Sequence, residues 1–222
     1  MPSVSLRSRP ILPLLVGLAF LVPIGASAAP PADPAAVVNA FVADLGRMSS
    51  DQSLNASDRE RAFSHILATD CDVSRIANYA LGSYFASAGT DERQAYDTLF
   101  ERWVTHVFAE RLGGFTSASF NVTGTAPAKD SADKIVSSTI SDDGRPVHID
   151  WRVSSGASGY RIVDVAMEGI SMAVVEREEI GDVLRRNGGT VAGLNHALEA
   201  KLTENASAPS RGSAQLTSTS SH

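Results

Sequence analysis

The segment 163–172, VDVAMEGISM, holds the residue types that acid–base and nucleophilic chemistry need. Asp164 and Glu168 are two nearby carboxylates, the pair a glycosidase uses, and Ser171 lies two residues after a glycine. A serine hydrolase requires G-x-S-x-G, and Ala173 occupies the place of the last glycine, so that motif fails. We interpret the two carboxylates as polar residues that bind backbone amides at a strand end and at the bend after it.

A metal site would need clustered ligands. His148 and Asp150 are two positions apart and share one face of an expected strand, so they supply two ligands at most. Arg152 lies on the same face, and solvent exposure explains all three. The sequence contains no HExxH, CxxC or Asp-rich loop. It therefore predicts no catalytic residues, no metal and no cofactor, that is, a protein that is not an enzyme.

The N-terminus predicts export. Arg7 and Arg9 precede an apolar run over 11–24, and Ala26-Ser27-Ala28 has the small-x-small pattern of a cleavage site. The run is too short for a membrane span, so we expect a signal peptide over 1–28, cleaved after Ala28.

Charge and cysteine content narrow the function further. The 222-residue chain has a formal net charge of −6, and loss of Arg7 and Arg9 with the signal peptide makes it two charges more acidic. An acidic chain lacks the basic patch that nucleic acid needs and is poorly suited to adhere to anionic lipid headgroups. Cys71 is the single cysteine, so no internal disulfide can form. We expect a small buried apolar residue there, with a nucleophile or an intermolecular link as alternatives.

The folded domain is expected over 29–202, followed by a disordered Ser/Thr/Ala-rich tail over 203–222. Helical periodicity dominates its first half and alternation its second. Helices are expected from Asp33-Pro34, from a cap at Ser57, from Asp72 to Gly82, from Thr90 to Gly113-Gly114, over 174–187 and over 190–202. Strands are expected near Phe120 and over 134–141, 147–153 and 160–167. This order predicts an α+β fold, with N-terminal helices packed on one face of a curved antiparallel sheet, an apolar pocket between them, and two C-terminal helices.

The helix that starts at Thr90 is apolar over about 180° of its surface, whereas an ordinary surface helix has an apolar stripe of about 100°. Such a helix must be covered from two directions. It is either central in a solid core or one wall of a cavity, and its periodicity leaves both alternatives open.

Several segments in this order resemble the MlaC (toluene-tolerance) family of periplasmic phospholipid carriers, including its hopanoid-associated branch. They extend over about residues 35–202. The segments are DVSRIANYALGSYF (72–85), TDERQAYDTLFERWVTHVFAERL (90–112), VHIDWRV (147–153), YRIVDVAMEGISM (160–172) and VVEREEIGDVLRRNGGTVAGLNHALEAKL (174–202).

The resemblance implies a monomeric, soluble periplasmic shuttle between an outer-membrane lipoprotein complex and an inner-membrane ABC transporter, as part of a lipid asymmetry system. It implies a deep apolar cavity that holds lipid tails, no catalytic residues, and only transient contact with membranes. The cargo would be phospholipid, with hopanoid or another apolar lipid as the alternative. A non-carrier periplasmic adaptor with a solid core is a further alternative.

A carrier must replace the burial that lipid tails have in a membrane. A diacyl lipid in water exposes on the order of 30 methylenes at about 0.8 kcal/mol each, or roughly 24 kcal/mol. We expect its tails to contact large apolar residues of the helices and of one sheet face. The candidates are Tyr79, Leu81, Phe85, Phe100, Trp103, Val104, Val107, Phe108, Ile140, Ile149, Trp151, Val165, Ile170 and Met172.

Overall fold

The structure is a computed structural model that describes residues 33–111, 119–142 and 145–207. The predicted signal peptide and the end of the helix at Gly113-Gly114 lie outside these residues. The described helices are α1 (Pro34–Ser50), α2 (Ala56–Asp70), α3 (Val73–Leu81), α4 (Tyr84–Ser87), α5 (Thr90–Arg111), α6 (Met172–Arg186) and α7 (Val191–Ser207). The strands are β1 (Asn121–Pro127), β2 (Lys134–Asp142), β3 (Arg145–Gly156), β4 (Gly159–Met167) and β5 (Ile170–Ser171). The α+β class is confirmed.

Capping side chains explain where the first helices begin. Asp33 caps α1, where its carboxylate accepts a hydrogen bond from the Ala35 amide at 3.0 Å, and Pro34 occupies the first turn. Asp72 caps α3 in the same way, and Gly82 ends that helix with a φ of +58°. These starts and this end agree with the sequence prediction.

The predicted cap of α2 is wrong. Asn55, two residues before Ser57, accepts a hydrogen bond from the Asp58 amide at 3.0 Å, so the helix begins at Ala56. Asn caps a helix as well as Ser does, and here the helix starts after the first of the two residues that can act as a cap. At the other end of the chain, α7 continues to Ser207, beyond the expected domain boundary at 202.

The five strands form one antiparallel sheet in the order β1-β2-β3-β4-β5. Along β3, the side chains of Ile149, Trp151 and Val153 are buried and alternate with more exposed neighbours, as predicted. The pairing of β3 with β4 shifts register after Arg152, and this irregularity adds one residue to β4. Consecutive residues Ile162 and Val163 are both buried as a result.

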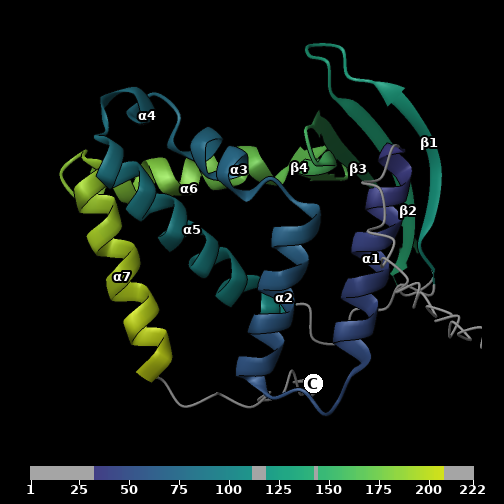
Figure 1. Ribbon diagram of the computed structural model, residues 1–222, viewed down its shortest axis with the longest axis horizontal. Coiled ribbons are helices and arrows are strands. Elements are labelled where there is room, and N and C mark those ends of the chain that lie inside the picture. The colour runs from purple at the N-terminus through teal and green to yellow at the C-terminus, as the bar shows by residue number, and fades with distance from the viewer. Residues whose placement is uncertain (1–32, 112–118, 143–144, 208–222) are drawn as a thin grey trace, which may run out of the picture.

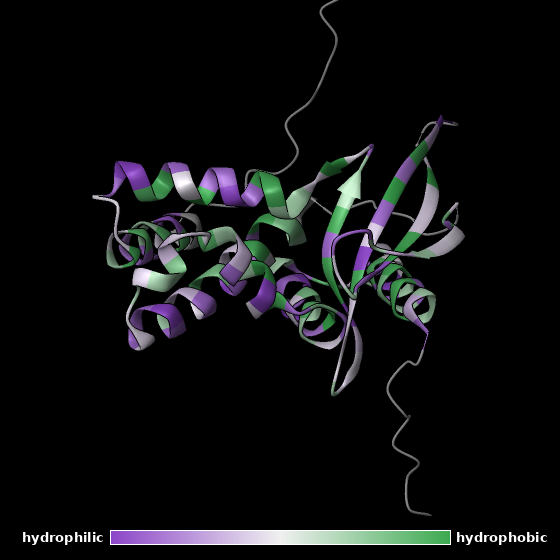
Figure 2. Ribbon diagram, turned by 90° about the horizontal axis from the view of Figure 1, so that it is seen from above, coloured by the Kyte–Doolittle hydropathy of each residue, from purple (hydrophilic) through white to green (hydrophobic). Residues whose placement is uncertain are grey.

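Two clusters of buried apolar residues divide the molecule. The first lies between α1, α2 and the sheet, and the second lies among α3, α5, α6 and α7. In Figure 1 the strands and α1 lie at one end and α7 at the other, and Figure 2 shows the same division from above. Helix α5 belongs to both, because Ala109 is buried in the first cluster and Phe100 in the second. None of the described helices is long and apolar enough to cross a membrane.

Cys71 joins α2 to the sheet. It forms a parallel bridge with Ile162 of β4, and the next amide, that of Asp72, donates a hydrogen bond to the Ile162 carbonyl at 2.9 Å. The thiol is buried, as expected, and burial raises its pKa well above the ordinary range.

Candidate functional site

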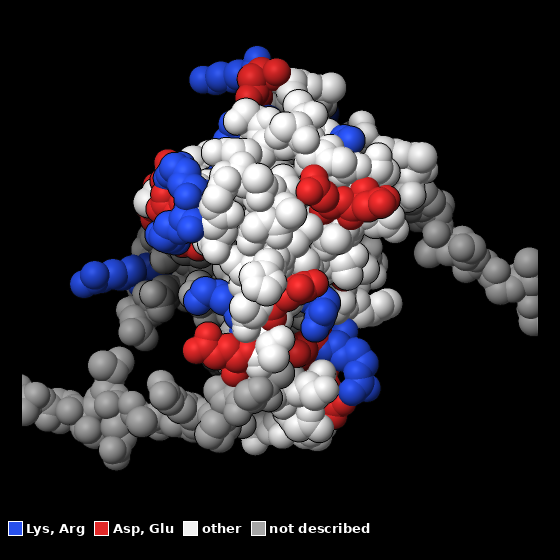
Figure 3. Space-filling model, turned by 90° about the vertical axis from the view of Figure 1, so that its left-hand side faces the viewer, with Lys and Arg blue, Asp and Glu red and all other residues white. Residues whose placement is uncertain are grey.

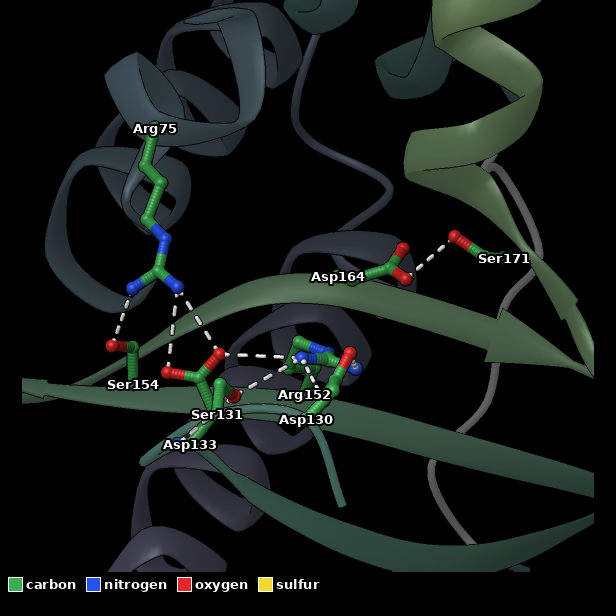
Figure 4. A network of polar contacts seen from close by, with 8 residues as sticks. All are labelled: Arg75, Asp130, Ser131, Asp133, Arg152, Ser154, Asp164 and Ser171. Carbon is green, nitrogen blue, oxygen red and sulfur yellow. Dashed lines mark hydrogen bonds and ion pairs between the residues drawn. The ribbon is translucent and has the colours of Figure 1, made fainter. Parts of the chain in front are cut away.

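Asp164 acts as a structural hydrogen-bond acceptor. One carboxylate oxygen accepts from the amides of Val165, at 2.8 Å, and Ala173, at 3.0 Å, and the other accepts from the Ser171 hydroxyl at 2.6 Å. Ser171 in turn caps α6 by accepting from the Val174 amide. The pair therefore fastens the start of α6 to β4 (Figure 4), and Ser171 has the role of a helix cap.

Glu168 closes the turn that follows β4. Its φ is +50° and that of Gly169 is +79°, the two positive values that a two-residue type I′ hairpin needs. Its amide donates to the His148 carbonyl at 2.9 Å, and its carboxylate accepts from the His148 amide at 2.5 Å. Both carboxylates of VDVAMEGISM thus bind backbone amides, as predicted from the sequence.

A network of ion pairs connects α3 with β3 and the segment that joins β1 to β2 (Figure 4). Arg75 of α3 pairs with Asp133 at 3.1 Å and donates to the Ser154 hydroxyl at 2.5 Å. Arg152 pairs with Asp133 at 3.4 Å and binds both carboxylate oxygens of Asp130, at 3.1 and 3.2 Å.

The charge balance of this network decides its role. Burial alone would raise the pKa of the Asp133 carboxyl, but hydrogen bonds from Ser154 and Ser131 and the charge of Arg75 hold that pKa below its ordinary value. Each arginine has a carboxylate partner, so the network holds elements together and offers no unpaired cation to a ligand.

The predicted tail-binding residues separate into two groups. Ile149 and Trp151 are buried in the first cluster, whereas Leu81 and Phe100 are buried in the second. Partly buried candidates pack around each. Phe108, Ile140 and Val165 lie against the first cluster, Phe85 and Trp103 against the second, and Val104 against both.

The remaining candidates lie elsewhere. Tyr79 is 43% exposed, and its ring lies under the Arg177 guanidinium, 5.1 Å away. Ile170 is 60% exposed on the short β5 strand. Helix α6 begins two residues before its predicted start, so Met172 is its first residue. Val107 is partly buried on α5. The candidates therefore do not converge on one place.

Burial of the apolar sheet face changes from one end to the other. Val136, Val153 and Ile162 at one end are at most 1% exposed. At the other end, Ile140 and its cross-strand partner Val147 remain only partly covered. We call seven of the partly buried apolar residues that pack against the first cluster the half-buried wall: Val104, Phe108, Phe120, Val122, Ile140, Val147 and Val165.

Three residues of the half-buried wall were not among the predicted candidates. Val147 precedes Ile149 and Trp151 by the alternation of β3, so the periodicity already placed it on their face. Phe120 packs its ring edge to face with Trp151, 6.2 Å between centroids, and Val122 lies opposite Ser138 of the same face. The signal for these two was weaker, because only the approximate start of β1 was predicted.

The polar sheet face offers no comparable ligand set. Asp150 accepts from the Ser137 hydroxyl at 2.6 Å and lies 3.1 Å from the His148 ring. Among the residues that the structure describes, no three His, Cys, Asp or Glu side chains are grouped so that they could hold a metal ion. The half-buried wall is therefore the candidate site, and what it offers a ligand is apolar contact.

Two comparisons with known proteins bear on the fold. A sequence model of a protein family, described as MlaC protein, matches residues 35–200. The chain also resembles the solved structure of a phospholipid-binding protein from Ralstonia solanacearum, in complex with a phospholipid, with a TM-score of 0.69. The two are 23% identical, and the match covers 79% of this chain and 99% of that one. At this identity the likeness shows the fold.

Proposed function

Because the chain belongs to the MlaC family, we propose that it is a lipid carrier that binds phospholipid tails against the half-buried wall. The observation that carries this proposal is the incomplete burial of apolar residues around the first cluster, with Ile140 and Val147 on the sheet and Val104 and Phe108 on α5. The phospholipid in the similar structure supports the class of cargo. Hopanoid or another apolar lipid is the alternative cargo, since an apolar wall selects for tails and not for a headgroup.

Energetics favour a protein-bound route for such a cargo. Each methylene withdrawn from water contributes about 0.8 kcal/mol, so a wall that covers tails offsets most of the cost of leaving a bilayer. A phosphate held against the same side chains without a partner would lose its hydration. The headgroup therefore stays in solvent at the edge of the wall.

The proposed setting is the periplasm, with an outer-membrane lipoprotein complex and an inner-membrane ABC transporter as partners. The chain would be the soluble component that shuttles phospholipid between them. Its net negative charge supports transfer through protein partners, because adsorption to an anionic bilayer would be repulsive.

Cargo is tested by native mass spectrometry of the gently purified protein. We expect co-purified phospholipid, or its uptake from vesicles of phosphatidylethanolamine and phosphatidylglycerol by delipidated protein. A mass that corresponds to hopanoid would identify the alternative cargo. An unliganded mass together with no uptake from vesicles contradicts the carrier function.

The wall is tested by Val147→Trp. We expect at least a tenfold loss of lipid uptake, with the free energy of unfolding changed by less than about 1 kcal/mol, because the indole occupies the partly covered space. In a non-carrier adaptor with a solid core, the same change would overpack that core and cost about 1–3 kcal/mol. Val174→Trp is the matched control, since Val174 is 42% exposed and lies outside the half-buried wall. Equal uptake by both variants and the unmodified protein would refute the wall.

A further inference from the structure

A hollow in the helical part of the molecule lies apart from the half-buried wall. It has a volume of ≈ 410 Å³ and is lined by residues of α5, α6 and α7. Its apolar lining includes Trp103, Ile180, Val183 and Leu198. The volume is within the range of about 300–1,000 Å³ that small-molecule sites have.

Part of the Trp103 indole is exposed in this hollow. One neighbour is Phe100, with 6.2 Å between ring centroids, and the side chain is only partly buried. Trp is rarely buried completely, but burial of its large ring contributes strongly to binding when a ligand covers it. The hollow is therefore suited to a flexible apolar group that completes the cover.

The charges at the rim restrict the other end of the ligand. Arg186 and Lys201 line the hollow, and neither makes an ion pair within the described part of the chain. Of the two acidic residues beside them, Asp182 is already paired with Arg185, which leaves Glu179. With Asp182 paired, the rim leaves Arg186 and Lys201 beside Glu179, whereas the chain as a whole is acidic. Figure 3 shows the α7 side of the molecule, where charges of both signs border uncharged surface.

We propose that this α6–α7 hollow binds the acyl chain of a single-chain anionic amphiphile, with its head near Arg186 and Lys201. A fatty-acid anion and an anionic lysophospholipid share this chemistry. The site is separate from the one proposed for the diacyl cargo, so it adds a second ligand class and does not rest on the carrier function.

The two tryptophans make the sites distinguishable. Trp151 is 5% exposed in the first cluster, whereas Trp103 lines the hollow. In Trp151→Phe, only Trp103 emits, and bromine atoms on a bound chain quench a tryptophan that they contact. We expect saturable quenching of Trp103 by dibrominated stearate and by a lysophosphatidylglycerol with a dibrominated chain. Whichever probe saturates at the lower concentration identifies the source, and absence of saturable quenching by both overturns the proposal.

Matched variants test the lining and the rim. Ala197→Phe fills the hollow and should abolish the quenching, also in the protein that retains both tryptophans, so the test does not depend on the folding of Trp151→Phe. Joint replacement of Arg186 and Lys201 by Gln should weaken binding about tenfold. Arg47→Gln, which removes an arginine of α1 that does not line the hollow and whose carboxylate partner Asp44 does not line it either, should not. Quenching that survives Ala197→Phe, or that falls equally in the rim and control variants, overturns the proposal.

The fluorescence of Trp151 allows the carrier function to be tested separately from the α6–α7 site. Trp103→Phe leaves Trp151 as the emitter, and a dibrominated phosphatidylcholine delivers a diacyl cargo. Quenching of Trp151 with none of Trp103 by any probe would leave the carrier function supported and the α6–α7 site refuted.

Discussion

At the scale of single residues, Asp164 shows how a carboxylate in a catalytic-looking segment can serve architecture alone. All of its observed hydrogen bonds come from two amides and one hydroxyl at the junction of β4 and α6. A general acid or base must instead face a substrate and exchange a proton with it. The serine beside it is engaged in the same junction, because its hydroxyl caps α6.

The junction is tested by a double-mutant cycle. Asp164→Ala should cost about 2 kcal/mol of unfolding free energy, since it leaves two amides without their acceptor. Ser171→Ala should cost about 1 kcal/mol as the loss of a helix cap. The double variant should lose at least about 0.5 kcal/mol less than the sum, because the two side chains share a hydrogen bond. Urea titration measures all three, and strict additivity would show that the bond contributes nothing.

At the scale of elements, the Arg75–Asp133 pair fastens α3 to the segment between β1 and β2. Asp133 is 4% exposed, so its charge has little water around it and depends on its partners. Asp130, in contrast, has a side chain that is 69% exposed, and solvent screens its pairing with Arg152.

This difference predicts how stability depends on pH. The pKa of Asp133 is lowered in the folded state, so its contribution is present above the pKa of the unfolded chain, about 3.9, and is lost as pH falls below it. Asp133→Asn should cost about 2 kcal/mol at pH 7 and should make the loss on acidification smaller than in the unmodified protein.

Urea titrations at neutral pH and on either side of pH 4 measure this effect. Asp130→Asn is the control, with a smaller loss at neutral pH because of its exposure. If Asp133→Asn and the unmodified protein lose the same stability on acidification, the pair does not carry this pH dependence.

Local signals predicted most elements. The caps at Asp33 and Asp72 and the alternation along β3 depend on residues a few positions apart, and each is confirmed. The bulge after Arg152 has no local signature, yet it decides that both Ile162 and Val163 are buried.

The candidate site was less predictable. A broad apolar arc on α5 does not tell which part faces which cluster, and the structure divides it, with Phe100 in one and Phe108 against the other. The degree of cover at Ile140 and Val147 depends on which distant elements pack over that part of the sheet, which is a tertiary property. Tyr79 and Ile170 matched the apolar pattern but lie on the surface.

At the scale of the whole molecule, α5 contributes buried residues to both clusters, and Val73 of α3 also packs against both. Val104 packs against both, and the continuous helix from Thr90 to Arg111 extends from one to the other. Unfolding one cluster alone would strip α5 of half its cover.

We therefore expect a single cooperative transition. The urea midpoints reported by Trp151, in Trp103→Phe, and by Trp103, in Trp151→Phe, should each match the midpoint from far-ultraviolet circular dichroism of the same variant. A midpoint from Trp103 that lies clearly below the circular dichroism value for that variant would show that the helical cluster unfolds on its own.

The buried thiol of Cys71 makes alkylation a measure of local opening in this protein. The thiolate is the nucleophile that displaces the leaving group of an alkylating reagent. Burial suppresses its formation, so the folded form should react only when a rare opening exposes Cys71 at its bridge to Ile162. With reagent in excess, the rate at which molecules gain one mass increment reports how often they open, because the chain has no second cysteine. Comparing the labelling rates with and without lipid would thus show whether cargo changes how often α2 separates from β4. The measurement needs no engineered probe.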